Sequence, residues 1–263
     1  MESTDFVALL QHLAPLELAE TWDNVGVLLQ RDERPVTRVL LTIDLTHAVL
    51  AEALTAEVDA IVSYHPPIFS GLKRVVASDP KGNLVAQLLH AGILVYSPHT
   101  ALDAVRGGVN DWLIGAFPVA SPRAITQAVG ANDSLVGQGR IGELETPLLL
   151  ERCVALVKHH LGLLHVRVSA AGKHEREPIN RVAVCAGAGG SLLSRCRADL
   201  LITGEMRHHD VLDQREQGVS VILTDHTNSE RGYLAVFERR LTERAPELEI
   251  VLSKSDSDPL VVT

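Results

Sequence analysis

The sequence predicts an α/β protein with parallel or mixed sheets, and three observations lead to that prediction. Short apolar runs of strand type alternate with segments of helical spacing along most of the chain. Several of these apolar runs end directly before a histidine or an acidic residue in a turn. With 263 residues, the chain can also form one large domain or two small ones around a sizeable core.

The composition excludes several classes of protein. A net charge of −9 argues against broad nucleic-acid binding, which needs many Lys and Arg side chains to neutralise phosphates. The three cysteines form no C-x-x-C pair, so we expect reduced thiols rather than disulfides or a sulfur-only zinc site. The acidic N-terminus lacks a signal-peptide pattern, and no apolar run reaches transmembrane length. We therefore expect a cytoplasmic protein without membrane contact.

The first part of the chain predicts a series of strands and helices in alternation. Ser3 or Thr4 is expected to cap the first helix, which Pro15 ends. Thr46 is expected to cap a second helix. Further strands are predicted at residues 39–43, 59–63 and 93–96, and further helices at 81–90 and 110–117.

The second part repeats this alternation after a segment rich in Gly, Pro and Ser. Residues 118–140 are predicted to be a loop that joins a first lobe, residues 1–125, to a second lobe, residues 126–263. Strands are predicted at residues 165–169, 182–185, 199–203, 219–223 and 248–252, and helices at 147–161 and 208–217.

The two lobes echo each other weakly. In each, an apolar strand, a helix and a strand preceded by Asp follow in order, at residues 39–65 and 182–205. In this alignment Glu205 takes the place of His65. The echo suggests two related halves that face each other across a cleft.

Candidate ligands for a divalent metal gather just after the strand ends, where open α/β sheets bind ligands. His226 and Glu230 are four residues apart and would share one face of a helix. His65, His99 and Asp103 follow two other strands. Imidazoles with two carboxylates suit Zn, Fe, Mn, Ni or Co, and the residue types do not choose among them. Taken singly, each is more often a surface or hydrogen-bonded core residue.

Three other features have two interpretations each. The glycine-rich turn at residues 186–190 is either a tight strand-to-helix connection, which we favour, or a contact for phosphate. Glu205 is either a base in the cleft or a simple acid at a strand end. Asp44 is interpreted as a cap of the following helix in preference to a residue that supports a metal ligand. No G-x-S-x-G or H-E-x-x-H motif is present to favour a serine hydrolase or a zincin.

Several motifs together resemble the Nif-three-like family, whose members are often described as GTP cyclohydrolase I type 2 homologues or dinuclear metal-centre hexameric proteins. The motifs are ETWDNVG at residues 20–26, SYHPPIF at 63–69, YSPHTALD at 96–103, GGVN at 107–110, TGEM at 203–206, and DH at 225–226 with ERG at 230–232. They run in the family's order over nearly the whole chain.

The resemblance implies a single two-lobed unit over residues 1–263, with two divalent metal ions in the cleft between the lobes. The implied ligands are His65, Asp103, His226 and Glu230, where residues 225–233 return ligands to the shared site and Glu230 bridges the metals. Many family members have His-His where this chain has Tyr64-His65, so the second metal is expected to be weaker, replaced by water, or supported by His99. The resemblance also implies a toroidal homohexamer.

Two functions are compatible with this resemblance. The first is a metal-dependent hydrolase of the GTP cyclohydrolase type, acting on a nucleotide or another small molecule, with Glu230 and His99 as catalytic residues. The second is a non-catalytic, metal-binding hexamer that acts as a regulatory or interaction protein. An open coordination position favours the first, and a metal bound by protein ligands alone favours the second.

Overall fold

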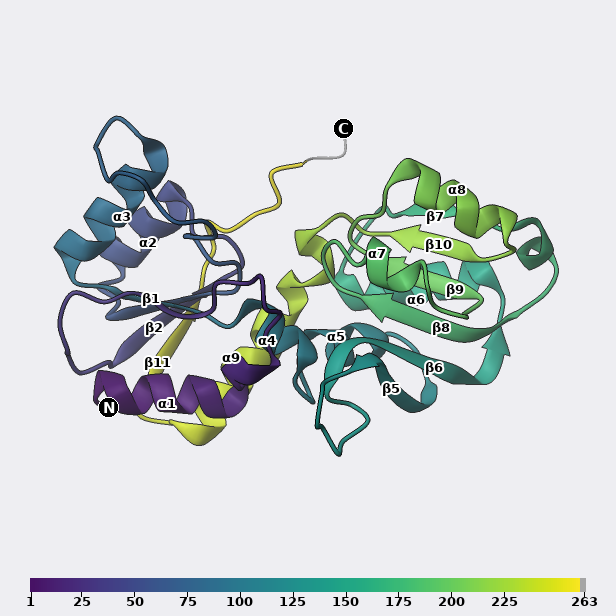
Figure 1. The fold of residues 1–263 in the computed structure, drawn as a ribbon, viewed down its shortest axis with the longest axis horizontal. Helices are drawn as coiled ribbons and strands as arrows, with labels where there is room; N and C mark the ends of the chain where they lie inside the picture. The colour runs from purple at the N-terminus through teal and green to yellow at the C-terminus, as the bar shows by residue number, and fades with distance from the viewer. Residues whose placement is uncertain (261–263) are drawn as a thin grey trace. The chain divides into compact units, whose positions relative to one another are not determined.

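The computed structural model describes residues 1–260 and divides into two compact units (Figure 1). Unit 1 contains Met1–Leu102 and Leu234–Pro259, and unit 2 contains Asp103–Tyr233. The last three residues of the predicted unit 1–263 lie outside the described residues. The predicted α/β fold with mixed sheets is confirmed, because each unit contains one mixed sheet with helices packed on it.

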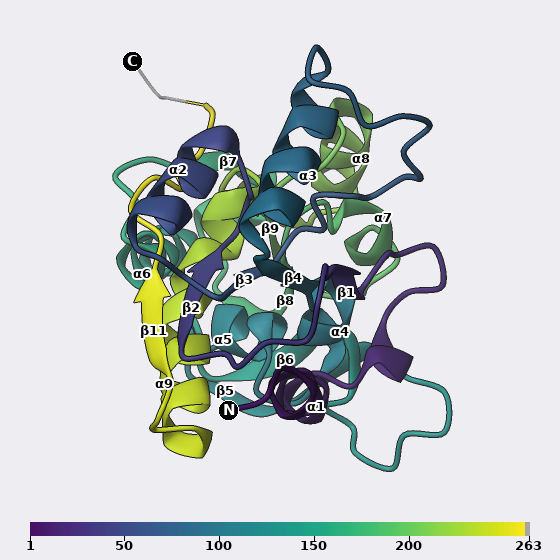
Figure 2. The ribbon, with the colours of Figure 1, turned by 90° about the vertical axis from the view of Figure 1, so that its left-hand side faces the viewer.

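Unit 1 is built on a five-stranded sheet with the order β1-β4-β3-β2-β11. Its strands are β1 (Gly26–Leu29), β2 (Arg38–Thr42), β3 (Ala60–Ser63), β4 (Leu94–Ser97) and β11 (Glu249–Leu252). Its helices are α1 (Ser3–Leu13), α2 (His47–Thr55), α3 (Pro80–Ala91) and α9 (Leu234–Arg244). Figures 1 and 2 both show α2 and α3 on one face of this sheet, and α1 and α9 on the other. Only β1 runs antiparallel to its neighbour.

The central strands of unit 1 are apolar because helices cover both faces of a parallel sheet. Every residue of β3 and β4 is buried. Local signals set the limits of the helices: Thr46 caps the start of α2 by accepting a hydrogen bond from the Val49 amide, and Gly92 ends α3 in a left-handed conformation. The expected cap of α1 is wrong, since Ser3 already lies inside the helix.

Unit 2 is built on a six-stranded sheet with the order β5-β6-β8-β9-β10-β7. Its strands are β5 (Val119–Gln127), β6 (Gly137–Leu148), β7 (Arg167–Ser169), β8 (Ile179–Cys185), β9 (Leu200–Thr203) and β10 (Ser220–Leu223). Its helices are α5 (Val109–Ile114), α6 (Leu150–Leu161), α7 (Gly190–Leu193) and α8 (His208–Glu216). The strands β8, β9 and β10 run parallel, and the outer strands run antiparallel to their neighbours.

The prediction of a loop at residues 118–140 is wrong, because most of this segment forms the hairpin of β5 and β6. The residues that suggested a loop are compatible with a strand at the edge of a sheet. Pro122 lies where the pairing register shifts, beside Ser121, whose φ is +46°. An edge strand tolerates proline there because its missing N–H is not needed by a second neighbour.

The weak sequence echo corresponds to a structural repeat. β7-β8-β9-β10 has the chain order, the sheet order and the strand directions of β1-β2-β3-β4. Before the third strand of each set, an aspartate accepts hydrogen bonds from the backbone at the start of the second strand: Asp59 in unit 1 and Asp199 in unit 2. The two units therefore contain the same four-stranded substructure.

The described residues can be compared with two further expectations, one about the cysteines and one about membrane-spanning helices. Cys153, Cys185 and Cys196 are all free, as expected for reduced thiols. Among residues 1–260, no helix has both the length and the apolar character needed to cross a membrane.

Candidate metal centre

In unit 1, His65 follows β3 and is held at two points. Its backbone N–H donates to the Ile43 carbonyl, and its ring Nδ1 lies 2.9 Å from a carboxylate oxygen of Asp44. A carboxylate at Nδ1 fixes the ring orientation and leaves Nε2 as the nitrogen that would bind a metal. The interpretation of Asp44 as a helix cap is wrong, since Thr46 caps α2 and Asp44 positions His65.

The second candidate imidazole of unit 1 is His99, at the start of α4 (His99–Ala104). Its φ of +27° is unusual for a residue with a side chain. Its Nδ1 lies 2.8 Å from Asp23, whose side chain is fully buried and also accepts hydrogen bonds from the backbone N–H and hydroxyl of Thr100. Burial alone would raise the pKa of Asp23, but the hydrogen bonds from His99 and Thr100 outweigh burial and lower it.

Tyr64 occupies the position where a second histidine was expected. The side chain is buried, and its ring centroid lies 5.0 Å from that of His65 and 5.5 Å from that of His99. These contacts make Tyr64 an apolar support for both imidazoles. The exposed Trp22 ring packs edge-on against His99, with the ring centroids 6.2 Å apart.

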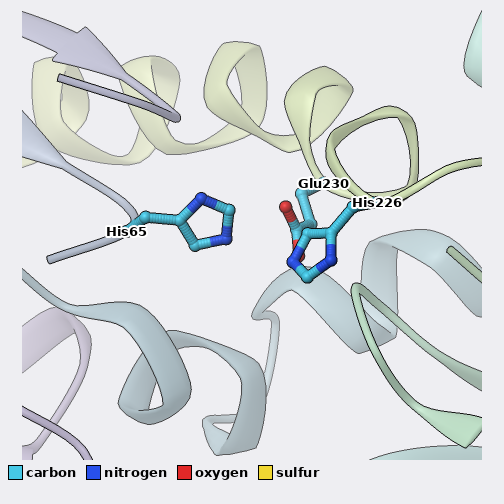
Figure 3. A group of neighbouring side chains, drawn as sticks. All are labelled: His65, His226 and Glu230. Carbon is cyan, nitrogen blue, oxygen red and sulfur yellow. The ribbon is translucent and has the colours of Figure 1, made fainter. Parts of the chain in front are cut away.

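In unit 2, His226 and Glu230 lie side by side after β10, as Figure 3 shows. The His226 Nε2 is 3.5 Å from the Glu230 Oε1. The predicted pairing of these residues is present, but the α-helix expected to produce it is not. The chain instead forms a 3₁₀ turn over Thr227–Ser229, and α9 begins only at Leu234. Ser229 stabilises this turn, because its hydroxyl donates to the His226 carbonyl and accepts from the Gly187 N–H.

His226 is oriented in the same way as His65. Its Nδ1 lies 3.2 Å from a carboxylate oxygen of Glu205, so Nε2 is again the nitrogen that would bind a metal. Gly187 lies close to both His226 and Glu230. A Cβ at Gly187 would lie 2.6 Å from the Glu230 Oε1 and 3.0 Å from the His226 Nε2. Only glycine leaves these two ligand atoms accessible.

Asp103 lies in α4 and belongs to unit 2. Burial is the main reason for the raised pKa of the Cys185 thiol, and the negative charges of Asp103 and Glu230 raise it further. Both carboxylates therefore act on the same thiol at the end of β8. Asn110 adds a local restraint by donating from its amide to the Asp103 carbonyl.

Three of the predicted ligands, His65 in unit 1 and His226 and Glu230 in unit 2, each offer one atom of a kind that binds metal ions. Figure 3 draws these three side chains. Asp23 and Gly187 were not predicted from the sequence as site residues. Asp23 lies in the ETWDNVG motif, so its position was marked, but the residue it binds, His99, is distant in sequence.

A family model identifies the family to which the chain belongs. The model of Duf34/NIF3 (NGG1p interacting factor 3) matches residues 1–259. The chain belongs to the Duf34/NIF3 family. The predicted resemblance is thereby confirmed. Curated relatives agree: the chain is 44% identical over 255 residues to "NIF3-like protein 1" of Drosophila melanogaster, covering 96% of this chain and 86% of the relative. It is 40% identical to "NGG1-interacting factor 3" of Saccharomyces cerevisiae, covering 92% and 90%.

Solved structures of other proteins share the fold. The Bacillus cereus protein related to NIF3 has a TM-score of 0.86 and 19% identity, and covers 100% of this chain and 99% of its own. Reduced HcgD from Methanocaldococcus jannaschii has a TM-score of 0.82 and 21% identity, with coverage of 97% and 98%. At these identities, the likeness shows a common fold.

Proposed function

We propose that this Duf34/NIF3 protein is a metal-dependent hydrolase of a nucleotide or another small molecule. In this proposal, two divalent ions bind to His65, Asp103, His226 and Glu230. The observation that supports the proposal most is the common arrangement of the imidazoles: in each unit, a carboxylate holds Nδ1 of the candidate ligand. Residues around metal sites characteristically orient histidine ligands in this way.

The residues present also fit such a centre chemically. Two imidazoles and two carboxylates suit Zn, Fe, Mn, Ni or Co. Gly187 fits because any side chain at this position would meet the ligand atoms of His226 and Glu230. A bound divalent ion would lower the pKa of water and polarise an oxygen of the substrate.

The protein's own residues would then position groups and move protons. Asp23 holds His99 through Nδ1, so that His99 can take up or release a proton at Nε2. Glu205 holds His226 in its ligand orientation. Glu230 is nearly fully buried and is the side chain whose loss would disturb the centre most.

The test is turnover and metal content of Glu230→Gln beside Glu243→Gln, an exposed control on α9. The substrate panel would begin with GTP and include phosphoesters. We expect metal-dependent turnover in the wild type and the control, and at least about a hundredfold loss in Glu230→Gln. Turnover by Glu230→Gln, or by metal-free wild type, at the wild-type rate would contradict the proposal.

The name of the yeast relative, "NGG1-interacting factor 3", favours a second candidate: a non-catalytic, metal-binding regulatory or interaction protein. Under either function we propose a homohexamer of the 28.4 kDa chain. Light scattering after chromatography would measure the assembly with and without chelator. A hexamer that retains metal but hydrolyses no member of the panel would favour the second candidate, and a monomer would contradict the proposed assembly.

A further inference from the structure

Unit 2 contains a cavity of about 570 Å³ between the turns that follow β8 and β9. Its size lies in the range of small-molecule sites, roughly 300–1,000 Å³. Its position is also typical of a ligand site, because ligands of open α/β sheets bind beyond the carboxyl ends of the parallel strands. The lining side chains that matter here are Arg167, Ser191, Glu205, Met206, Arg207 and Asp210.

The charged groups of the cavity differ in whether they already have partners. Arg167 forms an ion pair with Asp225 at 2.8 Å, and Glu205 holds His226. The side chains of Arg207 and Asp210, by contrast, form no hydrogen bond or ion pair with any residue from 1 to 260. The cavity therefore presents one guanidinium and one carboxylate that are both available to a ligand.

We propose that this cavity binds the sugar-phosphate part of the substrate. The Arg207 guanidinium is a strong donor to phosphate oxygens, and the Ser191 hydroxyl can add a further donor. Asp210 accepts hydrogen bonds only, so it suits the hydroxyl groups of a sugar rather than the phosphate. The side chain of Met206 supplies an adaptable apolar wall.

The cavity and the candidate metal centre share one residue. Glu205 lines the cavity and also holds Nδ1 of His226. A ligand in the cavity can therefore contact the same carboxylate that holds His226. The inference deepens the proposed hydrolase function and rests on it, because it names the chemical class of the substrate of that same site.

The experiment is calorimetric titration of the full-length protein, freed of metal by chelation, with ribose 5-phosphate, inorganic phosphate and GMP. We expect Arg207→Gln to weaken ribose 5-phosphate binding about tenfold or more. Arg152→Gln, an exposed arginine on α6, is the matched control and should bind like the wild type. Asp210→Asn should weaken ribose 5-phosphate but leave inorganic phosphate binding unchanged or stronger.

The outcomes separate this inference from the proposed function. Failure of the wild type to bind ribose 5-phosphate, or equal binding by Arg207→Gln, would overturn the sugar-phosphate site. Binding that depends on Arg207 supports the site even if metal analysis finds no bound metal, in which case only the hydrolase proposal fails. If GMP binds more tightly than ribose 5-phosphate, the sugar phosphate belongs to a nucleotide; otherwise it belongs to a free sugar phosphate.

Discussion

The two units contain the same four-stranded substructure but differ at the ends of its strands. The pairs Thr42–Ser63 in unit 1 and Cys185–Thr203 in unit 2 are equivalent positions of the parallel register. Two residues further along the chain, unit 1 has Asp44 and His65, where unit 2 has Gly187 and Glu205. The third parallel strand continues the pattern, with His99 in unit 1 and Asp225 in unit 2.

The equivalence extends to unusual backbone conformation. His99 and Asp225 both have positive φ, +27° and +65°, and each binds an oppositely charged or polar partner. In unit 1 that partner is Asp23, before β1, and in unit 2 it is Arg167, on β7. The repeat therefore preserves the backbone at the strand ends while the side chains change. Asp44, His65 and His99 of unit 1 thus correspond to Gly187, Glu205 and Asp225 of unit 2.

The largest difference between the sheets lies beside β2 and β8. Unit 1 places the parallel strand β11 beside β2, whereas unit 2 places β6 of the hairpin beside β8. Arg140 of β6 is fully buried and donates to the Asp111 carboxylate and to two backbone carbonyls of β6. We expect Arg140→Ala to lower the free energy of unfolding by about 3–5 kcal/mol, because it leaves Asp111 without its buried cation.

Urea unfolding of Arg140→Ala and Arg181→Ala would measure this effect. Arg181 lies on β8 and pairs with Glu143 of β6, but both side chains are exposed. The control should change stability by only about 0–1 kcal/mol. Equal effects of the two variants would mean that the hairpin does not depend on the buried ion pair.

The next effect concerns Gly187, which takes the position of Asp44. We expect Gly187→Ala to weaken zinc binding about ten- to hundredfold, because the new Cβ meets Glu230 and His226. Gly162→Ala is the control: its φ of +68° resembles the +61° of Gly187, but a Cβ there contacts nothing within 4 Å. Both variants should lose about 1 kcal/mol of stability from backbone strain. Zinc titration would show a metal effect only at Gly187, and a similar zinc affinity of both variants would contradict the proposed centre.

The equivalent aspartates Asp59 and Asp199 should contribute equally to the stability of their units. Burial raises the pKa of Asp59 and of Asp199, but backbone hydrogen bonds outweigh it and lower the pKa below the usual 3.8. We expect Asp59→Asn and Asp199→Asn each to destabilise by about 1–2 kcal/mol at neutral pH. The stabilisation from each aspartate should be present above pH 3.8 and be lost as the pH falls through the folded-state pKa. A large effect in one unit and none in the other would show that the two units share the backbone arrangement but not the stabilisation that each aspartate provides.

The smallest effect is a pH dependence near pH 6 that we expect from His174 of unit 2. His174 is buried against the Ser220 hydroxyl, 2.8 Å from its Nδ1, and burial lowers the pKa of His174 below 6.5. In unit 1, the register places Leu94 at the position of Ser220. Above pH 6.5 the stability is complete, and it falls by up to about 1 kcal/mol as the pH drops toward the folded-state pKa, because the unfolded chain takes up the proton first.

Urea unfolding at pH 8 and pH 5.5 would detect this loss. His174→Asn should remove part of the pH dependence, whereas His165→Asn, at an exposed histidine, should retain it. An unchanged pH dependence in His174→Asn would exclude His174 as its source.

The buried strands could be predicted from the sequence because burial on both faces makes a parallel strand a continuous apolar run. Residues 60–63 and 200–203 show this directly. The hairpin of β5 and β6 could not be predicted in the same way, since β5 is an edge strand with many exposed residues and a proline at its register shift. Its stability depends on Arg140, a charged residue whose burial no local pattern indicates.

Part of the candidate site could also be predicted from the sequence. The strand-end histidines stand out because they lie within three residues of the end of an apolar run, and Glu230 stands out because it lies four residues after His226. Asp23 could not be assigned a role, because its partner His99 is 76 residues away along the chain. Gly187 was interpreted as part of a tight turn, and its φ of +61° agrees with that, but its closeness to His226 and Glu230 comes from the fold of unit 2.

The central claim is that His65 and His226 are metal ligands, and metal content per chain tests it most directly. The protein would be purified without chelator or affinity tag and analysed by mass spectrometry, with His65→Ala for unit 1, His226→Ala for unit 2, and His165→Ala as an exposed control. We predict about two metal equivalents in the wild type and the control, with metal lost in both site variants. Metal that is absent from the folded wild type, or that remains unchanged when either His65 or His226 is removed, would contradict the claim.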